Sequence, residues 1–112
     1  ALNALGYTLA DRTSRYKEAQ EYIKRAATLV PDDPAILDSL GWVSYRLGEL
    51  DEALKWLAKA FEKLEDAEIA AHYGEVLWHS NQKEKAREVW NKGKQQNADN
   101  PVLIETLKRI QP

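Results

Sequence analysis

The stretch that decides the fold is residues 40–60, which read LGWVSYRLGELDEALKWLAKA. Gly41 lies inside an apolar pattern of helical spacing, and Gly48 separates that pattern from a second one. A glycine inside a helix costs about 1 kcal/mol relative to alanine, so Gly41 needs a packing reason. Gly48 suits the left-handed residue that commonly ends a helix. The stretch therefore predicts two helices, and they should be antiparallel because their connection is short.

The same arrangement recurs along the chain with a period near 34 residues. One column holds Gly6, Gly41 and Gly74, spaced 35 and 33 residues apart. Three further columns, each spaced 34 and 33 residues apart, are Ala19, Ala53 and Ala86; Ile23, Leu57 and Trp90; and Ala26, Ala60 and Gly93. A fixed period of this length predicts stacked supersecondary units. We expect the small residues to leave room where two antiparallel helices nest.

Helix boundaries follow from capping residues. Helix starts are marked by N-cap residues, two of which precede a proline at the first helical position: Asp33-Pro34, Asp66 and Asn100-Pro101. Gly48 and Asn81 suit left-handed helix ends. The chain is expected to form seven helices, near 2–11, 16–30, 35–47, 51–64, 67–80, 83–97 and 101–110. The first turn is predicted at 11–15, which contains no glycine.

The chain of 112 residues fits one small domain. It divides into repeats near 1–33, 34–66 and 67–100, followed by a helix at 101–110. That last helix carries an apolar stripe and is expected to cover the exposed side of the third repeat. The chain has no methionine, and Ala1 already lies inside a helical pattern. We therefore expect this sequence to be a fragment of a longer protein.

Composition argues against several classes of function. Lys and Arg number 16 against 18 Asp and Glu, and the charges are interspersed, so no basic patch predicts nucleic-acid binding. The chain contains no cysteine and no apolar run of membrane-spanning length. Its serines lack the context of a catalytic nucleophile, and no glycine-rich phosphate loop is present. We expect no catalysis, no cofactor and no membrane insertion within this fragment.

The repeat resembles the tetratricopeptide repeat (TPR) family. The family pattern places a Leu-Gly pair in the first helix, and here the matching pairs are Leu5-Gly6, Leu40-Gly41 and Tyr73-Gly74. It places alanines around a large apolar residue in the second helix, as the other three columns do. The resemblance implies an all-α fold of three antiparallel helix-turn-helix repeats plus a C-terminal capping helix, wound as a right-handed superhelical solenoid. It also implies a scaffold or adaptor that binds other proteins.

A narrower resemblance concerns 40–48 and 71–78, which are similar to the C-terminal repeats of TPR lipoproteins from Gram-negative bacteria. Such lipoproteins sit on the outer membrane facing the periplasm, and some act as adaptors for a carboxy-terminal processing protease. The resemblance therefore implies the periplasmic side of the outer membrane and a periplasmic protease as partner. The cytoplasm is the alternative location.

The candidate binding site is the concave groove lined by the first helices of the repeats. Residues displaced from the core face of those helices are Asn3, Tyr7, Asp11, Asp38, Ser39, Trp42, Tyr45, Arg46, Glu68, His72, Glu75, Trp78 and His79. The last helix would add Glu105 and Arg109. Exposed aromatic residues among acids favour an apolar partner segment that carries some positive charge. The alternative is that the aromatic residues pack between neighbouring helix pairs.

Three other functions can be compared with the sequence: zinc binding, structural support and regulation of an enzyme. His72, Glu75 and His79 share one helix face, but histidines seven residues apart lie about 10.5 Å apart along the axis, too far to share one zinc ion. The chain could instead be a structural spacer or oligomerisation module that uses the end faces of the stack, with self-association through an uncapped N-terminal end. It could also regulate an enzyme encoded elsewhere in a longer chain.

Overall fold

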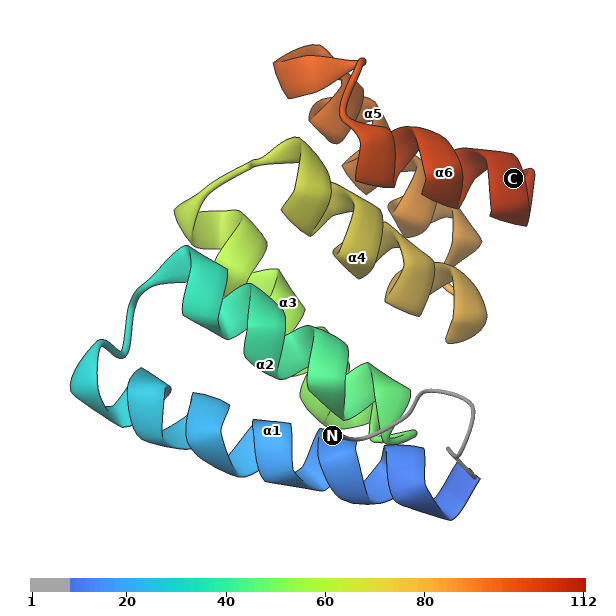
Figure 1. Ribbon diagram of the computed structural model, residues 1–112. Helices are drawn as coiled ribbons and strands as arrows, with labels where there is room; N and C mark the ends of the chain where they lie inside the picture. Colours follow the sequence, from blue (N-terminus) through green and yellow to red (C-terminus); the bar gives the residue numbers. More distant parts are fainter. Residues whose placement is uncertain (1–8) are drawn as a thin grey trace.

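The computed structural model describes the backbone of residues 9–112 and the side chains of residues 14–112. This part of the chain is helical, without any strand (Figure 1). Its helices are α1 (Leu9–Leu29), α2 (Pro34–Arg46), α3 (Leu50–Lys63), α4 (Ala67–His79), α5 (Lys83–Asn97) and α6 (Pro101–Ile110). The all-α class is confirmed, and the last five helices begin and end within one residue of their predicted bounds.

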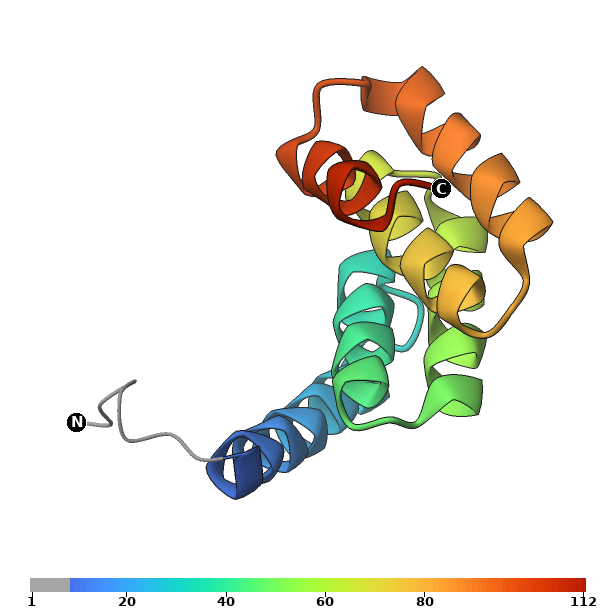
Figure 2. The same ribbon diagram turned by 90° about the vertical axis from the view of Figure 1, so that its right-hand side faces the viewer.

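The helices stack in two layers. Helices α2, α4 and α6 lie side by side, and α3 and α5 lie behind them as the antiparallel partners of α2 and α4 (Figure 1). Helix α1 packs against α2 at one end of the stack. Figure 2 shows α1 and α6 extending to the same side, beyond α2 and α4. The layer of first helices therefore forms a concave face whose floor is α2 and α4.

The turn predicted at 11–15 is wrong. Helix α1 runs without a break from Leu9 to Leu29. None of the five residues is a glycine or proline, so none forces the backbone out of a helical conformation. The rest of the first predicted helix, 2–8, lies outside the described residues.

The glycine columns have the packing role expected of them. A Cβ on Gly41 would lie 2.5 Å from Cγ of Leu57, and a Cβ on Gly74 would overlap the indole of Trp90. Each glycine of a first helix thus receives the large apolar residue of the second helix in the same pair. Gly93 lies on the second helix of its pair, and a Cβ there would lie 2.6 Å from Cβ of Ala70 on α4, the first helix of the same pair.

The predicted caps are also confirmed. The side chains of Asp33, Asp66 and Asn100 accept hydrogen bonds from backbone N–H groups in the first turns of α2, α4 and α6. Gly48 and Asn81 have φ angles of 81° and 66°, the left-handed conformation predicted for both turns. The two complete helix pairs therefore share one local design.

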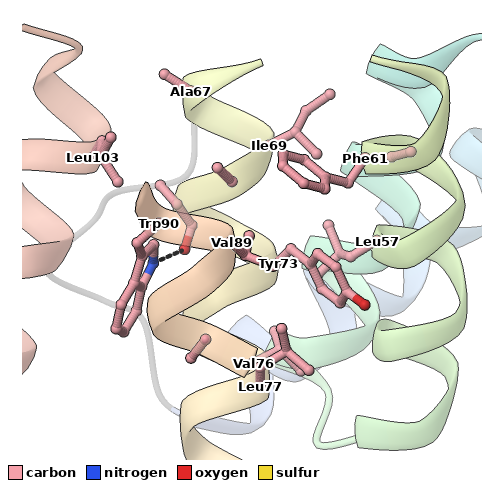
Figure 3. Packing of buried hydrophobic residues seen from close by; sticks show 14 of the residues in the cluster. Leu57, Phe61, Ala67, Ile69, Tyr73, Val76, Leu77, Val89, Trp90 and Leu103 are labelled. Atoms are coloured by element: carbon pink, nitrogen blue, oxygen red, sulfur yellow. Dashed lines mark hydrogen bonds between the residues drawn. The ribbon is translucent and has the colours of Figure 1, made fainter. Parts of the chain in front are cut away.

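The hydrophobic core lies between α3, α4 and α5 and continues to Leu103 of α6 (Figure 3). Trp90 is its largest fully buried side chain, and its indole Nε1 donates to the carbonyl oxygen of Ala71 at 3.4 Å. Helix α6 packs on both α4 and α5, as expected for a helix that covers the third repeat. The core thus fixes α4, which carries five of the predicted site residues.

Candidate functional site

Four aromatic side chains form a continuous row across α2 and α4. Trp42 stacks on His72 with ring centroids 4.2 Å apart and lies 5.0 Å from Tyr45. Tyr45 in turn stacks on His79 at 6.4 Å. Residues three and seven apart share a helix face, which explains why each helix supplies two members. We call Trp42, Tyr45, His72 and His79 the aromatic row.

A hollow of about 300 Å³ opens beside one end of this row. Its lining residues come from three helices: Tyr16, Ala19 and Ile23 of α1, Asp38, Ser39, Trp42, Val43 and Arg46 of α2, and Glu68 and His72 of α4. We call it the concave hollow. Five of its ten lining residues are aliphatic or aromatic and five are polar or charged, and binding sites commonly combine apolar walls with placed polar groups.

Asp38 and His72 form a polar pair inside the concave hollow. Nδ1 of His72 donates to Oδ1 of Asp38 at 2.9 Å, and Asp38 is only 8% exposed. This hydrogen bond links α2 to α4 and fixes the imidazole in place against Trp42. Asp38 is therefore already partnered within the protein, and it is not a free acid of the kind that the sequence suggested.

Glu75 is the centre of a second polar cluster. The residue is 4% exposed, and its side chain accepts from Arg109 through two hydrogen bonds, of 2.6 Å from Nη2 and 3.3 Å from Nη1. The Tyr45 hydroxyl donates to Glu75 at 3.2 Å, and Arg109 also pairs with Glu105. The cluster joins α2, α4 and α6. A bidentate guanidinium–carboxylate pair has defined geometry, so it helps to set how these helices stack.

Tyr45 should make stability fall at alkaline pH. Burial, reinforced by the Glu75 carboxylate, raises the pKa of the Tyr45 hydroxyl from 10.0 to about 12. The hydroxyl favours folding below its unfolded pKa of 10.0, and that contribution disappears as pH rises through about 12. Urea unfolding across this window should show a smaller loss of stability for Tyr45→Phe than for the wild type. Equal pH slopes for the two proteins would contradict this.

Two contacts hold α1 beside the concave hollow. Arg46 lies over the Tyr16 ring at 5.6 Å, and its Nε donates to the Tyr16 hydroxyl at 3.3 Å. Gln20, which is buried, donates to Glu49 at 2.8 Å and to Ser44 at 3.3 Å. No local pattern in the sequence indicates these long-range contacts. It identified Ala19 and Ile23 as packing columns without indicating that they line a site.

The structure brings together most of the predicted site residues. Asp38, Ser39, Trp42, Arg46, Glu68 and His72 line the concave hollow, while Tyr45, Glu75 and His79 lie along the aromatic row and its polar cluster. Glu105 and Arg109 join them as expected. Asn3 and Tyr7 lie outside the described residues, and for Asp11 only the helical backbone is described.

Trp78 is placed apart from the other predicted residues. Its ring lies 5.8 Å from that of Trp90, and Lys83 and Arg87 of α5 lie over it at 4.8 Å and 5.2 Å. Trp78 therefore packs against the second helix of its own pair. Although Tyr45 occupies the equivalent column, its hydroxyl reaches across to α4.

The described residues also bear on metals and membranes. Among the side chains of residues 14–112, no group of three or more histidine, aspartate or glutamate residues is arranged to hold a metal ion. His72 and Glu75 instead contact Asp38 and Arg109. In the same part of the chain, no helix combines the length and the apolar character needed to cross a bilayer.

Nested helix pairs with a concave face define a helical-repeat scaffold. The sequence model of the Tetratricopeptide repeat family matches residues 4–63, which is more than half of the chain. The chain therefore belongs to the tetratricopeptide repeat family, as the sequence pattern predicted. Repeats of this family generally act as non-catalytic scaffolds for protein–protein interaction, and this chain is a scaffold in that broad sense.

Three curated proteins are similar to the chain. It is 61% identical over 75 residues to TPR repeat-containing protein PA4667 of Pseudomonas aeruginosa, an alignment covering 67% of this chain and 13% of that protein. It is 32% identical over 56 residues to Anaphase-promoting complex subunit 6 of Arabidopsis thaliana, covering 50% of this chain and 10% of the relative. It is 33% identical over 52 residues to the Cell division cycle protein 16 homolog of Homo sapiens, covering 46% and 8%. The chain thus matches only a small part of each relative's length.

Proposed function

We propose that the chain binds a segment of another protein on its concave face, with an apolar side chain of that segment inserted in the concave hollow beside Trp42. The hollow is the observation that carries the proposal. It offers about 300 Å³ between three helices, and half-buried Trp42 is among its walls. A concave, mostly apolar site with a few placed polar groups is the usual form of a binding site.

The aromatic row supports the proposal because it is already ordered. Trp42 contacts Tyr45 on its own helix and His72 on the next, and the Asp38 hydrogen bond holds His72. A side chain held in this way loses little rotational freedom when a partner binds. Large aromatic anchors of this kind commonly provide much of the energy of an interface.

The charges of the hollow narrow the expected partner. Asp38 and Glu75 are paired internally, whereas Glu68 is exposed at the start of α4 and lines the hollow. Arg46, the last residue of α2, is engaged by the ring of Tyr16. The proposed partner segment therefore carries one basic group beside its apolar anchor, to lie near Glu68. A grip on a C-terminal carboxylate is disfavoured, since Arg109 is engaged by Glu75 and Glu105.

Trp42→Ala should lower the affinity for a verified partner at least tenfold, which corresponds to about 1.4 kcal/mol. The reason is the loss of the indole that borders the hollow. Titration calorimetry with a partner obtained by pulldown on the intact protein measures the effect. Trp78→Ala is the matched control, because Trp78 is also half-buried but contacts Trp90, Lys83 and Arg87 of α5 and does not line the hollow. Unchanged affinity in Trp42→Ala, or an equal loss in both variants, would refute the placement.

The proposal extends to the cell compartment in which the chain works and to the kind of partner that it binds. The resemblance of 40–48 and 71–78 to repeats of outer-membrane lipoproteins supports a periplasmic partner, including a processing protease. Fractionation of cells that make the intact protein, followed by pulldown from each fraction, tests this extension. Recovery of the protein with cytoplasmic partners alone would remove it without affecting the concave site.

A structural spacer or oligomerisation module is the second candidate function. Helix α1, at the end of the stack, exposes Tyr22 and Leu29, the latter by 83%, and Val30 directly after the helix is exposed as well. Scattered exposed apolar residues are ordinary, but three at one end of a stack favour contact between end faces. Sedimentation equilibrium tests this candidate, because Leu29→Glu would then dissociate an oligomer that Trp42→Ala leaves intact.

A further inference from the structure

On the side of the molecule opposite the concave face, two hollows are lined by equivalent positions of successive repeats. One lies between α1, α2 and α3, and the other lies between α3, α4 and α5. One hollow is lined by Lys24, Ala27, Thr28, Pro31, Leu37, Leu40, Trp56 and Lys59. The other is lined by Ala58, Phe61, Glu62, Glu65, Tyr73, Lys85, Glu88, Val89 and Lys92. Seven residues of the first set occur in the second set one repeat later, 34 or 33 positions along the chain. We call them the first and second convex grooves.

The two grooves differ in how far the protein fills them. Phe61 lies in the second groove, 6.0 Å from the ring of Tyr73, and that hollow is about 220 Å³. The first groove has Ala27 in place of Phe61 and Leu40 in place of Tyr73, and its hollow is about 400 Å³. Trp56 takes the position of Val89, but its side chain does not close the first groove. The first groove thus keeps an apolar vacancy where the next repeat supplies its own aromatic ring.

The charges at the rims differ as well. Glu62, Glu65 and Glu88 border the second groove together with two lysines. In the first groove the charged lining residues are Lys24 and Lys59. Asp32, which follows the lining residue Pro31, pairs with Lys59 at 3.9 Å and with Lys63 at 3.8 Å, so one carboxylate is shared by two lysines. The rim of the first groove is therefore basic.

We propose that the first convex groove is a second protein-binding site, which takes an aromatic side chain flanked by carboxylates. The partner's ring would occupy the place that Phe61 holds in the next repeat, over the buried side chains of Leu37 and Leu40. Its carboxylates would meet Lys24 and Lys59. Burial of an apolar ring supplies the affinity, and the charge pattern selects acidic over basic segments. This site shares no lining residue with the concave hollow, so it does not depend on the function proposed above.

The test uses a labelled synthetic peptide in which one phenylalanine has two glutamates on each side. Fluorescence anisotropy should show binding to the 112-residue chain. The affinity should be at least tenfold higher than for the same peptide with alanine for phenylalanine or with lysines for the glutamates. Amide resonances of residues lining the first convex groove should shift in NMR titration. Binding no stronger than that of the alanine peptide, or shifts confined to the concave face, would overturn the proposal.

Two variants test the groove without depending on each other. Ala27→Phe copies the residue of the next repeat, so it should leave the fold intact while it lowers the peptide affinity at least tenfold. The charge reversal Lys24→Glu with Lys59→Glu should do the same from the rim. Lys92→Glu, at the position equivalent to Lys59, and Trp42→Ala should leave the affinity unchanged. Full peptide affinity in Ala27→Phe would contradict the proposal. Self-association of the chain in sedimentation that Ala27→Phe abolishes would also contradict it, because a second copy of the chain would then occupy the groove.

Discussion

Replacing Trp90 with alanine is expected to lower the free energy of unfolding by about 4 kcal/mol. Trp90 is 1% exposed, packs against Gly74, and donates its indole N–H to the carbonyl oxygen of Ala71. Its loss would leave a cavity between α4 and α5 and would remove the additional hydrogen bond to the Ala71 carbonyl oxygen. Urea unfolding followed by circular dichroism measures the change. A loss below about 1 kcal/mol would show that the third helix pair does not depend on this contact.

A double-mutant cycle isolates the contact between the tryptophan and the glycine. Gly74→Ala alone should destabilise the protein by about 1–3 kcal/mol, because its Cβ has no space beside the indole. In the Trp90→Ala background the same change should be neutral or stabilising by up to about 1 kcal/mol, since the clash is removed and alanine favours a helix. Equal effects in both backgrounds would mean that Gly74 is not there to accommodate Trp90.

Arg109→Leu is expected to lower the free energy of unfolding by about 3 kcal/mol. The change strands the Glu75 carboxylate, which is 4% exposed and would keep only the Tyr45 hydrogen bond. An uncompensated buried charge costs more than the pair contributed. Hydrogen exchange should also rise across α6, which this pair joins to α4.

Two controls define the origin of that loss. Glu105→Ala removes the exposed partner of Arg109 and should change stability by no more than about 1 kcal/mol. Adding Glu75→Gln to Arg109→Leu should recover part of the loss, because no charge is then stranded. If the double variant is less stable than Arg109→Leu alone, the buried charge is not the cause.

The sequence predicted most of the fold because its signals are local and repeated. Helix ends at Asp33, Asp66 and Asn100 depend on capping within one turn, and the glycine columns repeat with one period. Both are readable without knowing how helices pack. The first turn was misplaced because 11–15 contains polar residues that suit either a turn or a helix. Polar character alone does not end a helix when no glycine or proline is present.

The site was predicted less completely, because side-chain partners depend on how neighbouring helices stack. Helical phase placed Trp42, Tyr45 and His72 on one face. It could not show that Asp38 meets His72, 34 positions along the chain, or that Glu75 is buried beneath Arg109. The contact between Trp78 and Trp90 could not be predicted either. The equivalent position to Trp90 in the second repeat is Leu57, so that repeat offers no precedent for a second ring there.

These pairings changed the expected chemistry of the groove. From the sequence alone, Asp38 and Glu75 are expected to be free acids of the groove. In the structure both are engaged, and Glu68 is the exposed acid at the concave hollow. The partner inferred from the structure therefore needs less positive charge than the sequence suggested. Its recognition depends more on the apolar anchor beside Trp42.

Site-specific photocrosslinking of the intact protein, in the cells that produce it, tests the concave binding site most directly. A benzophenone side chain replaces Ser39, which is exposed and lines the concave hollow, or Lys85, which is exposed on α5 in the other layer. Binding in the concave hollow predicts a discrete crosslinked partner from position 39, and Trp42→Ala should weaken this crosslink at least tenfold. A partner crosslinked from position 85 alone, or a crosslink from position 39 that Trp42→Ala leaves unchanged, would contradict it.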